Sequence, residues 1–187
     1  MFEGGNLSIE DLDFIFQNEV VKVIAEVDSP EIKLTGLSVG PFEAQKEYEV
    51  VYWVAKELAR RGIVRFRDAD MLDITKLSRI HWAEKVQKPR QLTQLPKDFY
   101  PKLRRFLEEL KEKAANNPEK IRDYMRADGM FKDIVNRRLR KIVLLASSLG
   151  KTNQLVLNNL TEEEKILYSK IRGAIESWRA DILKTRS

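Results

Sequence analysis

The sequence predicts an α+β fold in which a small β-rich domain precedes a larger all-α helical bundle domain. β-Branched residues and short alternating runs are concentrated before about residue 66, whereas apolar residues recur at helical spacing from residue 70 onward. The chain has 187 residues, 43% of them hydrophobic and 34% charged, so it is long enough to bury a sizeable core. We place the domains at residues 1–68 and 69–187.

Short strands are predicted in the first domain. Residues 20–27 are rich in valine, and residues 31–35 alternate apolar with polar side chains. We expect these two strands to pair across the turn signal at Asp28-Ser29-Pro30. Residues 37–42, which lie among glycines, are either a third, irregular strand or a structured loop.

A helix is predicted from about Glu43. Val50 and Val54 fall on one stripe of it, and Arg60-Arg61-Gly62 supplies a basic last turn followed by a glycine just past the helix end. A further short strand at residues 63–66 completes the predicted domain.

Helices are expected throughout the second domain. Apolar stripes predict helices over residues 70–82 and 99–110, separated by a linker at residues 85–95. Asn116-Asn117-Pro118 ends the second of these helices, because proline cannot continue a helix at that position.

Two long helices follow. The first begins after Pro118, is interrupted or bent at Asp128-Gly129, and carries the longest apolar stripe in the chain, from Phe131 to Leu149. The second opens with a capping box at Thr161-Glu162-Glu163-Glu164. Its predicted buried side consists of Ile166, Leu167, Ile171, Ile175, Trp178 and Ile182.

Charge is distributed unevenly along the chain. Residues 1–50 hold 3 Lys/Arg and 11 Asp/Glu, whereas residues 51–187 hold 31 and 18, which gives net charges of −8 and +13 within the total of +5. This polarity fits either a partner-directed surface or ordinary solubility. The candidate basic face for a partner or DNA is formed by Arg137, Arg138, Arg140 and Lys141. Because no aromatic residues are interleaved with it, we expect protein contact there to outweigh contact with DNA.

The composition excludes several kinds of active site. The chain has no cysteine and a single histidine, His81, so it has no disulfide framework, thiol nucleophile or histidine-based metal cluster. We expect His81 to be a half-buried side chain with a hydrogen-bond partner. Residues 1–13 carry acids where a signal peptide needs a basic and apolar run, and no stretch reaches the ~20 apolar residues of a membrane span. A cytoplasmic location is predicted.

Two local motifs contain residue types found in phosphate-binding or cation-binding sites. Gly150-Lys151-Thr152 has the residue types that end a phosphate-binding loop, but Leu145 stands where that loop needs glycine, so Gly150 is better explained as the residue that ends a helix. The cluster of Asp68, Asp70 and Asp73 could bind a cation, but its place before a helix favours helix capping. No catalytic residue, metal or cofactor is predicted.

A series of ordered motifs covers nearly the whole chain. These motifs are Ile32 to Gly36, Gly40-Pro41-Phe42, Glu49 to Leu58, Asp70 to Leu77, Leu95 to Tyr100 and Asn158 to Thr161. In this order they resemble the GINS family, and within it the subunit class that places a small β domain before its helical domain. The short length, the high proportion of charged residues and the lack of cysteine favour an archaeal, heat-adapted member of this family.

The resemblance implies a non-catalytic scaffold of chromosome replication. GINS subunits form a tetramer through their helical domains, so this chain would pair with the class whose α domain comes first. The complex joins the MCM helicase and a RecJ-like or Cdc-type protein in the replicative helicase, with primase or polymerase as further candidate partners. Contact with DNA would be weak or indirect. The alternatives are a free-standing DNA-binding protein that uses the basic face and an enzyme that uses the aspartate cluster.

The two longest apolar stripes supply the candidate subunit interface. A small bundle need not bury stripes of this length, so we expect part of them to face another GINS subunit. Periodicity leaves open which of their residues are core and which are interface. The candidates are Phe131, Ile134, Ile142, Ile171, Ile175 and Trp178.

Overall fold

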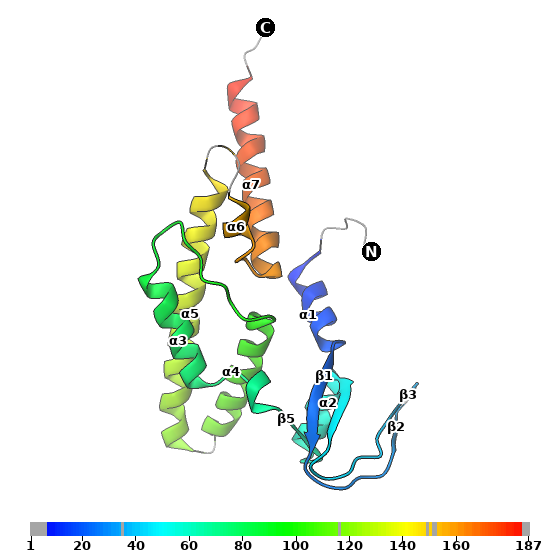
Figure 1. Ribbon diagram of the computed structural model, residues 1–187. Coiled ribbons are helices and arrows are strands. Elements are labelled where there is room, and N and C mark those ends of the chain that lie inside the picture. The colour runs from blue at the N-terminus through cyan, green and yellow to red at the C-terminus, as the bar shows by residue number, and fades with distance from the viewer. Residues whose placement is uncertain (1–6, 35, 116, 149, 151–152, 185–187) are drawn as a thin grey trace. The chain divides into compact units, whose positions relative to one another are not determined.

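The computed structural model describes residues 7–34, 36–115, 117–148, 150 and 153–184. The chain forms two compact units, of which one consists of Glu10–Met71 and the other contains the chain from Leu72 onward (Figure 1). In the described residues all strands belong to the first unit, and a bundle of helices forms the second. The predicted α+β fold class is therefore confirmed. The division into independent domains at residues 1–68 and 69–187 stays a prediction.

An antiparallel sheet lies at the centre of the first unit. Its strands, in spatial order, are β4 (Glu47–Val51), β1 (Val20–Ala25) and β5 (Val64–Phe66). A separate hairpin pairs β2 (Ile32–Leu34) with β3 (Leu37–Val39). The predicted pairing of residues 20–27 with 31–35 is therefore wrong, because β1 takes its two partners from later in the chain.

The helix predicted from Glu43 begins later than expected. α2 spans Tyr52–Arg60, and the residues before it form β4, in which Val50 is buried and pairs with β1. The buried Val50 of β4 fits the helical spacing of the apolar residues in α2, so the apolar stripe placed the predicted start of the helix too early. The predicted end is confirmed, since Gly62 has φ +71° just past the helix.

α2 packs against the sheet over an apolar core. α1 (Ile9–Gln17), which the sequence patterns did not reveal, adds Phe16, whose ring centroid lies 4.5 Å from that of Tyr52 in α2. The buried residues of this core are Val23, Ala25, Val39, Phe42, Val50, Val54, Ala55, Leu58 and Val64.

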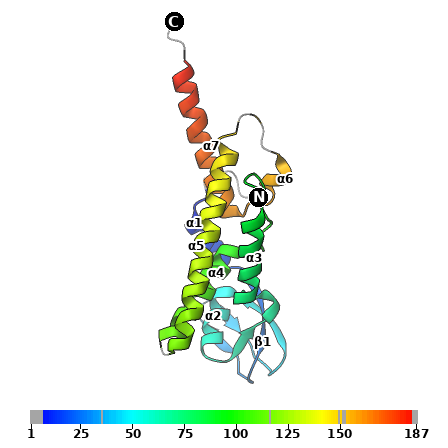
Figure 2. The ribbon, with the colours of Figure 1, turned by 90° about the vertical axis from the view of Figure 1, so that its left-hand side faces the viewer.

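α5 (Pro118–Ala146) is the central helix of the second unit. It contacts α3 (Ile74–Val86), α4 (Phe99–Ala115) and α7 (Glu162–Leu183), as Figures 1 and 2 show. The helix runs through Asp128-Gly129 without a break, so the predicted interruption there is wrong. A glycine inside a helix costs only about 1 kcal/mol, which the packing of α3 and α4 on α5 offsets.

The start of α3 is set by an aspartate cap. The Asp73 side chain accepts a hydrogen bond from the backbone N–H of Lys76 at 2.8 Å, so the helix begins at Ile74 and not at residue 70. Asp68–Asp70 form a short 3₁₀ turn before it. The aspartate cluster thus contributes a helix cap, as its position favoured.

The connection between α5 and α7 corrects the expectation for Gly150. α5 ends at Ala146 with Ser147 as its C-cap, so Gly150, at φ +88°, lies too far along to be the residue that ends the helix. Lys151 and Thr152 of the Gly-Lys-Thr motif are outside the described residues. The short helix α6 (Gln154–Leu157) precedes α7.

Two buried apolar clusters hold the helices of the second unit together. One joins α3, α4 and α5, with Leu77, Leu103 and Ile134 each at 0% exposed. The other lies between the C-terminal half of α5 and the start of α7 and includes Ile142 and Leu160. Within the described part of the chain, none of the helices has the length and apolar character needed to cross a membrane.

Candidate functional site

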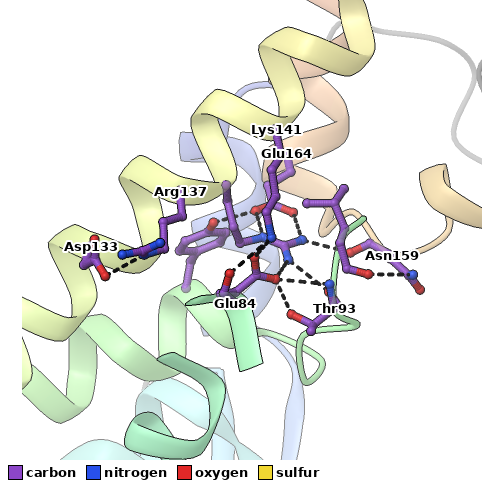
Figure 3. Close-up of polar contacts among 10 residues, drawn as sticks. Glu84, Thr93, Asp133, Arg137, Lys141, Asn159 and Glu164 are labelled. Carbon is purple, nitrogen blue, oxygen red and sulfur yellow. Dashed lines mark hydrogen bonds and ion pairs between the residues drawn. The ribbon is translucent and has the colours of Figure 1, made fainter. Parts of the chain in front are cut away.

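A buried ion network connects α5 to α3, to the loop after α3 and to α7 (Figure 3). At its centre, Arg138 of α5 is 0% exposed. Its Nη1 donates to Glu84 Oε1 and its Nη2 to Glu164 Oε2, both at 2.6 Å, while its Nε donates to Glu164 Oε1. The backbone carbonyls of Thr93 and Asn159 accept the remaining N–H groups at 2.9 Å. All five donors of the guanidinium are therefore satisfied.

A second cation and a tyrosine complete the network. Lys141 donates from Nζ to Glu84 Oε2 at 2.6 Å, and the Tyr100 hydroxyl donates to Glu164 Oε1 at 2.6 Å. The two carboxylates are thus matched by two cations, Arg138 and Lys141. Buried charges are tolerated when they are paired and hydrogen-bonded in this way.

Burial and pairing act on the titration of these groups in opposite directions. Burial acts to raise the pKa of Glu84, but hydrogen bonds from Lys141 and Thr93, together with the charge of Arg138, lower it overall. Burial acts to lower the pKa of Arg138, but its hydrogen bonds and ion pair with Glu164 raise it. Burial and the Glu164 carboxylate both raise the pKa of Tyr100. Glu84 and Arg138 therefore stay charged near neutral pH, and Tyr100 stays neutral.

The network fixes the beginning of α7. Glu164 is the last residue of the capping box predicted at Thr161 and the third residue of α7. The Thr161 N–H donates to Glu164 Oε2 at 3.0 Å, and the Glu164 N–H donates to Thr161 Oγ1 at 3.4 Å. The same carboxylate therefore caps α7 and binds Arg138 of α5, which positions the first turn of α7 on the bundle.

Two arginines hold α7 to the segment that follows α5. Arg172 donates to the carbonyl of Gly150, and Arg179 to the carbonyl of Ser147, each from Nη2 at 3.0 Å. Beyond these contacts, the C-terminal part of α7 projects past the end of α5 (Figures 1 and 2).

The C-terminal part of α7 exposes apolar side chains. Trp178, Ile182 and Leu183 are 63%, 64% and 76% exposed. Trp178 and Ile182 are four residues apart, so they are neighbours on the helix surface, and Ile175 continues the stripe towards the bundle. We call Ile175, Trp178, Ile182 and Leu183 the α7 apolar surface, and it is the candidate functional site.

The structure separates the candidate interface residues into core and surface. Ile134 and Ile142 are 0% and 1% exposed within the chain's own core, so the expectation that they face another subunit is corrected. The reason is that α3, α4 and α7 already cover this side of α5. The other four retain exposed surface to different degrees: Phe131, Ile171, Ile175 and Trp178.

The predicted basic face is also corrected. Arg138 and Lys141 are buried and ion-paired, Arg137 is half-buried and donates to Asp133 at 2.7 Å, and Arg140 alone of the four is exposed. Arg138 and Lys141 are three residues apart and share one side of α5, whereas Arg140, two residues from Arg138, faces nearly the opposite way. The carboxylates that meet the buried pair come from distant segments. No sequence signal singled out Glu84 as a buried partner, whereas Glu164 was marked by its capping box.

His81 and the aspartate cluster have structural partners. His81 Nε2 lies 2.7 Å from Asp133 Oδ2 and is half-buried, as expected. Asp73 caps α3, and Asp70 forms an ion pair with Arg67 at 2.7 Å. In the part of the chain that the structure describes, no group of three or more histidine or carboxylate side chains is arranged to hold a metal ion.

Comparison with known proteins adds an independent line of evidence. Residues 71–183 match the family model described as the GINS complex protein helical bundle domain, and residues 8–66 match the one described as the PSF2 N-terminal domain. The DNA replication complex GINS protein PSF2 of Xenopus laevis is 29% identical over 157 residues, which cover 83% of this chain and 80% of that protein. The human protein of the same name is 28% identical over 153 residues, covering 81% and 78%.

Proposed function

The chain belongs to the GINS family, and on that premise we propose that it is a non-catalytic structural subunit of a GINS complex in chromosome replication. A match to the PSF2 N-terminal domain ahead of the helical domain supports its placement in the class whose β domain comes first. Its origin in an archaeon stays a prediction from length and composition.

The observation that carries this proposal is the α7 apolar surface. Trp178, Ile182 and Leu183 lie on a helix whose first turn is fixed by a buried ion network, while the second half has little cover from the rest of the bundle. Exposed tryptophan and isoleucine side chains on a helix provide the kind of anchor on which protein interfaces depend. A subunit that assembles through its helical domain needs such an anchor.

The partner that we propose for this surface is a GINS subunit of the class whose α domain comes first, in a tetramer. MCM and a RecJ-like or Cdc-type protein are the further proposed partners of the complex, with primase or polymerase as candidates. These assignments rest on the family resemblance. The role implies location on the chromosome.

The proposal is tested by co-expressing the chain with a GINS subunit of the α-first class and measuring the mass and affinity of the complex. Trp178→Ala should weaken assembly by at least about 30-fold, because a buried aromatic anchor contributes about 2 kcal/mol or more. It should leave the free energy of unfolding of the isolated chain nearly unchanged, because the side chain is 63% exposed.

Trp82→Ala is the matched control, because Trp82 is 65% exposed on α3 of the same unit and lies outside the α7 apolar surface. It should assemble like the unaltered chain. Unchanged assembly of Trp178→Ala would show that the α7 apolar surface is not the interface. Failure of the unaltered chain to form any complex with the α-first subunit would overturn the proposed function itself.

A further inference from the structure

The segment from α3 to the start of α4 exposes cations without exposed carboxylates to balance them. Between Asp73 and Asp98 the sequence has one acid, Glu84, which is 1% exposed and already paired with Arg138 and Lys141. Four cations of this segment are exposed and form no ion pair with another described residue: Arg79, Lys85, Lys88 and Arg90.

Trp82 lies among these cations on the outer face of α3. Its side chain is 65% exposed, and Val86, one turn later, is 56% exposed. Arg79 and Lys85 are each three residues from Trp82, which places them beside it on the helix surface. Leu77 is 0% exposed and marks the opposite face of the helix, which packs into the bundle.

The neighbouring helix does not neutralise this face. Asp133 of α5 approaches α3 at His81, but the same carboxylate accepts a hydrogen bond from Arg137 at 2.7 Å. One negative charge is thus shared between a histidine and an arginine. We call the group of Arg79, Trp82, Lys85, Val86, Lys88 and Arg90 the Trp82 surface.

We propose that the Trp82 surface binds single-stranded nucleic acid. A base stacks on the exposed indole, and the surrounding lysines and arginines contact the adjacent phosphates. This surface has the interleaved aromatic residue that the Arg137 to Lys141 face lacks. The proposal goes beyond the proposed function, because it assigns nucleic-acid contact to a surface outside the α7 apolar surface.

The balance of apolar and charged groups favours a single strand over an acidic protein. A protein interface has an apolar core, and Trp82 and Val86 are the two exposed large apolar side chains of α3. A stacked base needs only an open ring face with cations around it. Because stacking makes no hydrogen bonds to the edges of the bases, binding should depend little on the base sequence of the strand.

The test measures binding of a fluorescently labelled oligo(dT) to the purified full-length chain by anisotropy. Trp82→Ala should weaken binding at least about fivefold, because stacking of one base contributes about 1 kcal/mol or more. Trp82→Phe should retain part of the affinity, since it keeps a smaller ring. Trp178→Ala is the matched control and should bind like the unaltered chain.

A second measurement tests the cations. The triple variant Lys85→Gln, Lys88→Gln, Arg90→Gln should reduce the slope of log affinity against log salt by about 2, because each phosphate contact on a single strand contributes about 0.7. The control triple variant, Lys111→Gln, Lys113→Gln, Arg122→Gln, removes the same residue types from exposed positions on α4 and α5 and should leave the slope unchanged.

Three results would overturn this inference. The first is oligo(dT) binding that is unchanged in Trp82→Ala, and the second is duplex DNA that binds as tightly as oligo(dT) and equally well to Trp82→Ala. The third is binding of poly-glutamate that depends on Trp82, without binding of oligo(dT). The last would indicate an acidic protein partner. Assembly with the α-first GINS subunit is measured on the same variants. If Trp82→Ala loses oligo(dT) binding but assembles normally, the inference is supported. If Trp178→Ala binds oligo(dT) and also assembles normally, that result counts only against the proposed function.

Discussion

Arg138 shows how one side chain can organise a helical bundle. Its five N–H groups bind two carboxylates and two carbonyls that come from α3, the following loop, the segment before α7, and α7 itself. Replacing a complete buried ion network by apolar residues can be neutral for stability, but removing one member leaves the others buried and unpaired. We infer that the network selects the positions of α3 and α7 on α5.

Arg138→Gln should lower the free energy of unfolding by about 3–5 kcal/mol, because it leaves Glu164 without its buried cation. Arg140→Gln is the matched control on the same helix; that arginine is exposed, so the change should stay within about 0.5 kcal/mol. Urea denaturation followed by circular dichroism measures both. Equal effects of the two variants would show that the network does not hold the bundle together.

Glu84 should make stability depend on pH in the acidic range. Its pKa in the folded chain is lowered from 4.5, so the carboxylate contributes stability above that value, and the contribution is lost as the pH falls through the lower folded pKa. The stability gap between the unaltered chain and Glu84→Gln should therefore narrow as the pH is taken below 4.5. Denaturation curves at neutral and acidic pH test this, and a constant gap would contradict it.

At the scale of elements, α7 combines a restrained start with a projecting end. The capping box and Arg138 hold its first turn, whereas the α7 apolar surface occupies the C-terminal part of the helix, on both sides of the contact between Arg179 and Ser147. A helix fixed at one end presents the side chains at its other end in a defined direction. Less conformational freedom is then lost when a partner binds, which favours affinity.

Thr161→Ala should lower the free energy of unfolding by about 1 kcal/mol, because the backbone N–H of Glu164 loses its acceptor. Ser169→Ala, at an exposed interior position of α7, is the control and should change stability by only a few tenths of a kcal/mol. Thermal unfolding of both variants provides the measurement. A Thr161→Ala variant as stable as the control would mean that Arg138 alone sets the first turn.

At the scale of the whole molecule, the two units have separate apolar cores. The sheet and α2 enclose one, and the helices after Leu72 enclose the others. The segment between them contains a single 3₁₀ turn, Asp68–Asp70, none of whose residues is buried. The predicted domain boundary between residues 68 and 69 falls within this turn.

Brief digestion with trypsin should cut first after Arg67, because the bond lies in this exposed segment between two cores. Mass spectrometry should then find fragments that correspond to the two units. Cuts that appear first within β-hairpins or helices, with the Arg67 segment protected, would contradict independent units.

The sequence alone determined the features that depend on neighbouring residues. The capping box at Thr161, the end of α2 at Gly62 and the order of a sheet-bearing part before a helical part could all be predicted, because caps and periodicity act over a few residues. For these features the local pattern and the folded structure agree. Trp178, which the pattern placed on the buried side of the last helix, is instead 63% exposed.

Only the tertiary structure decided which surfaces are covered. The apolar spacing of Ile142 and Trp178 looks alike in sequence, yet one is buried at 1% and the other is 63% exposed. Arg138 and Arg140 differ in the same way, because Glu84 and Glu164 reach only the first. Burial depends on elements that lie far away in the chain, and the same holds for the partners of β1. A pattern of neighbouring residues does not indicate which distant residues will contact them, because these contacts form only when the helices and strands pack together.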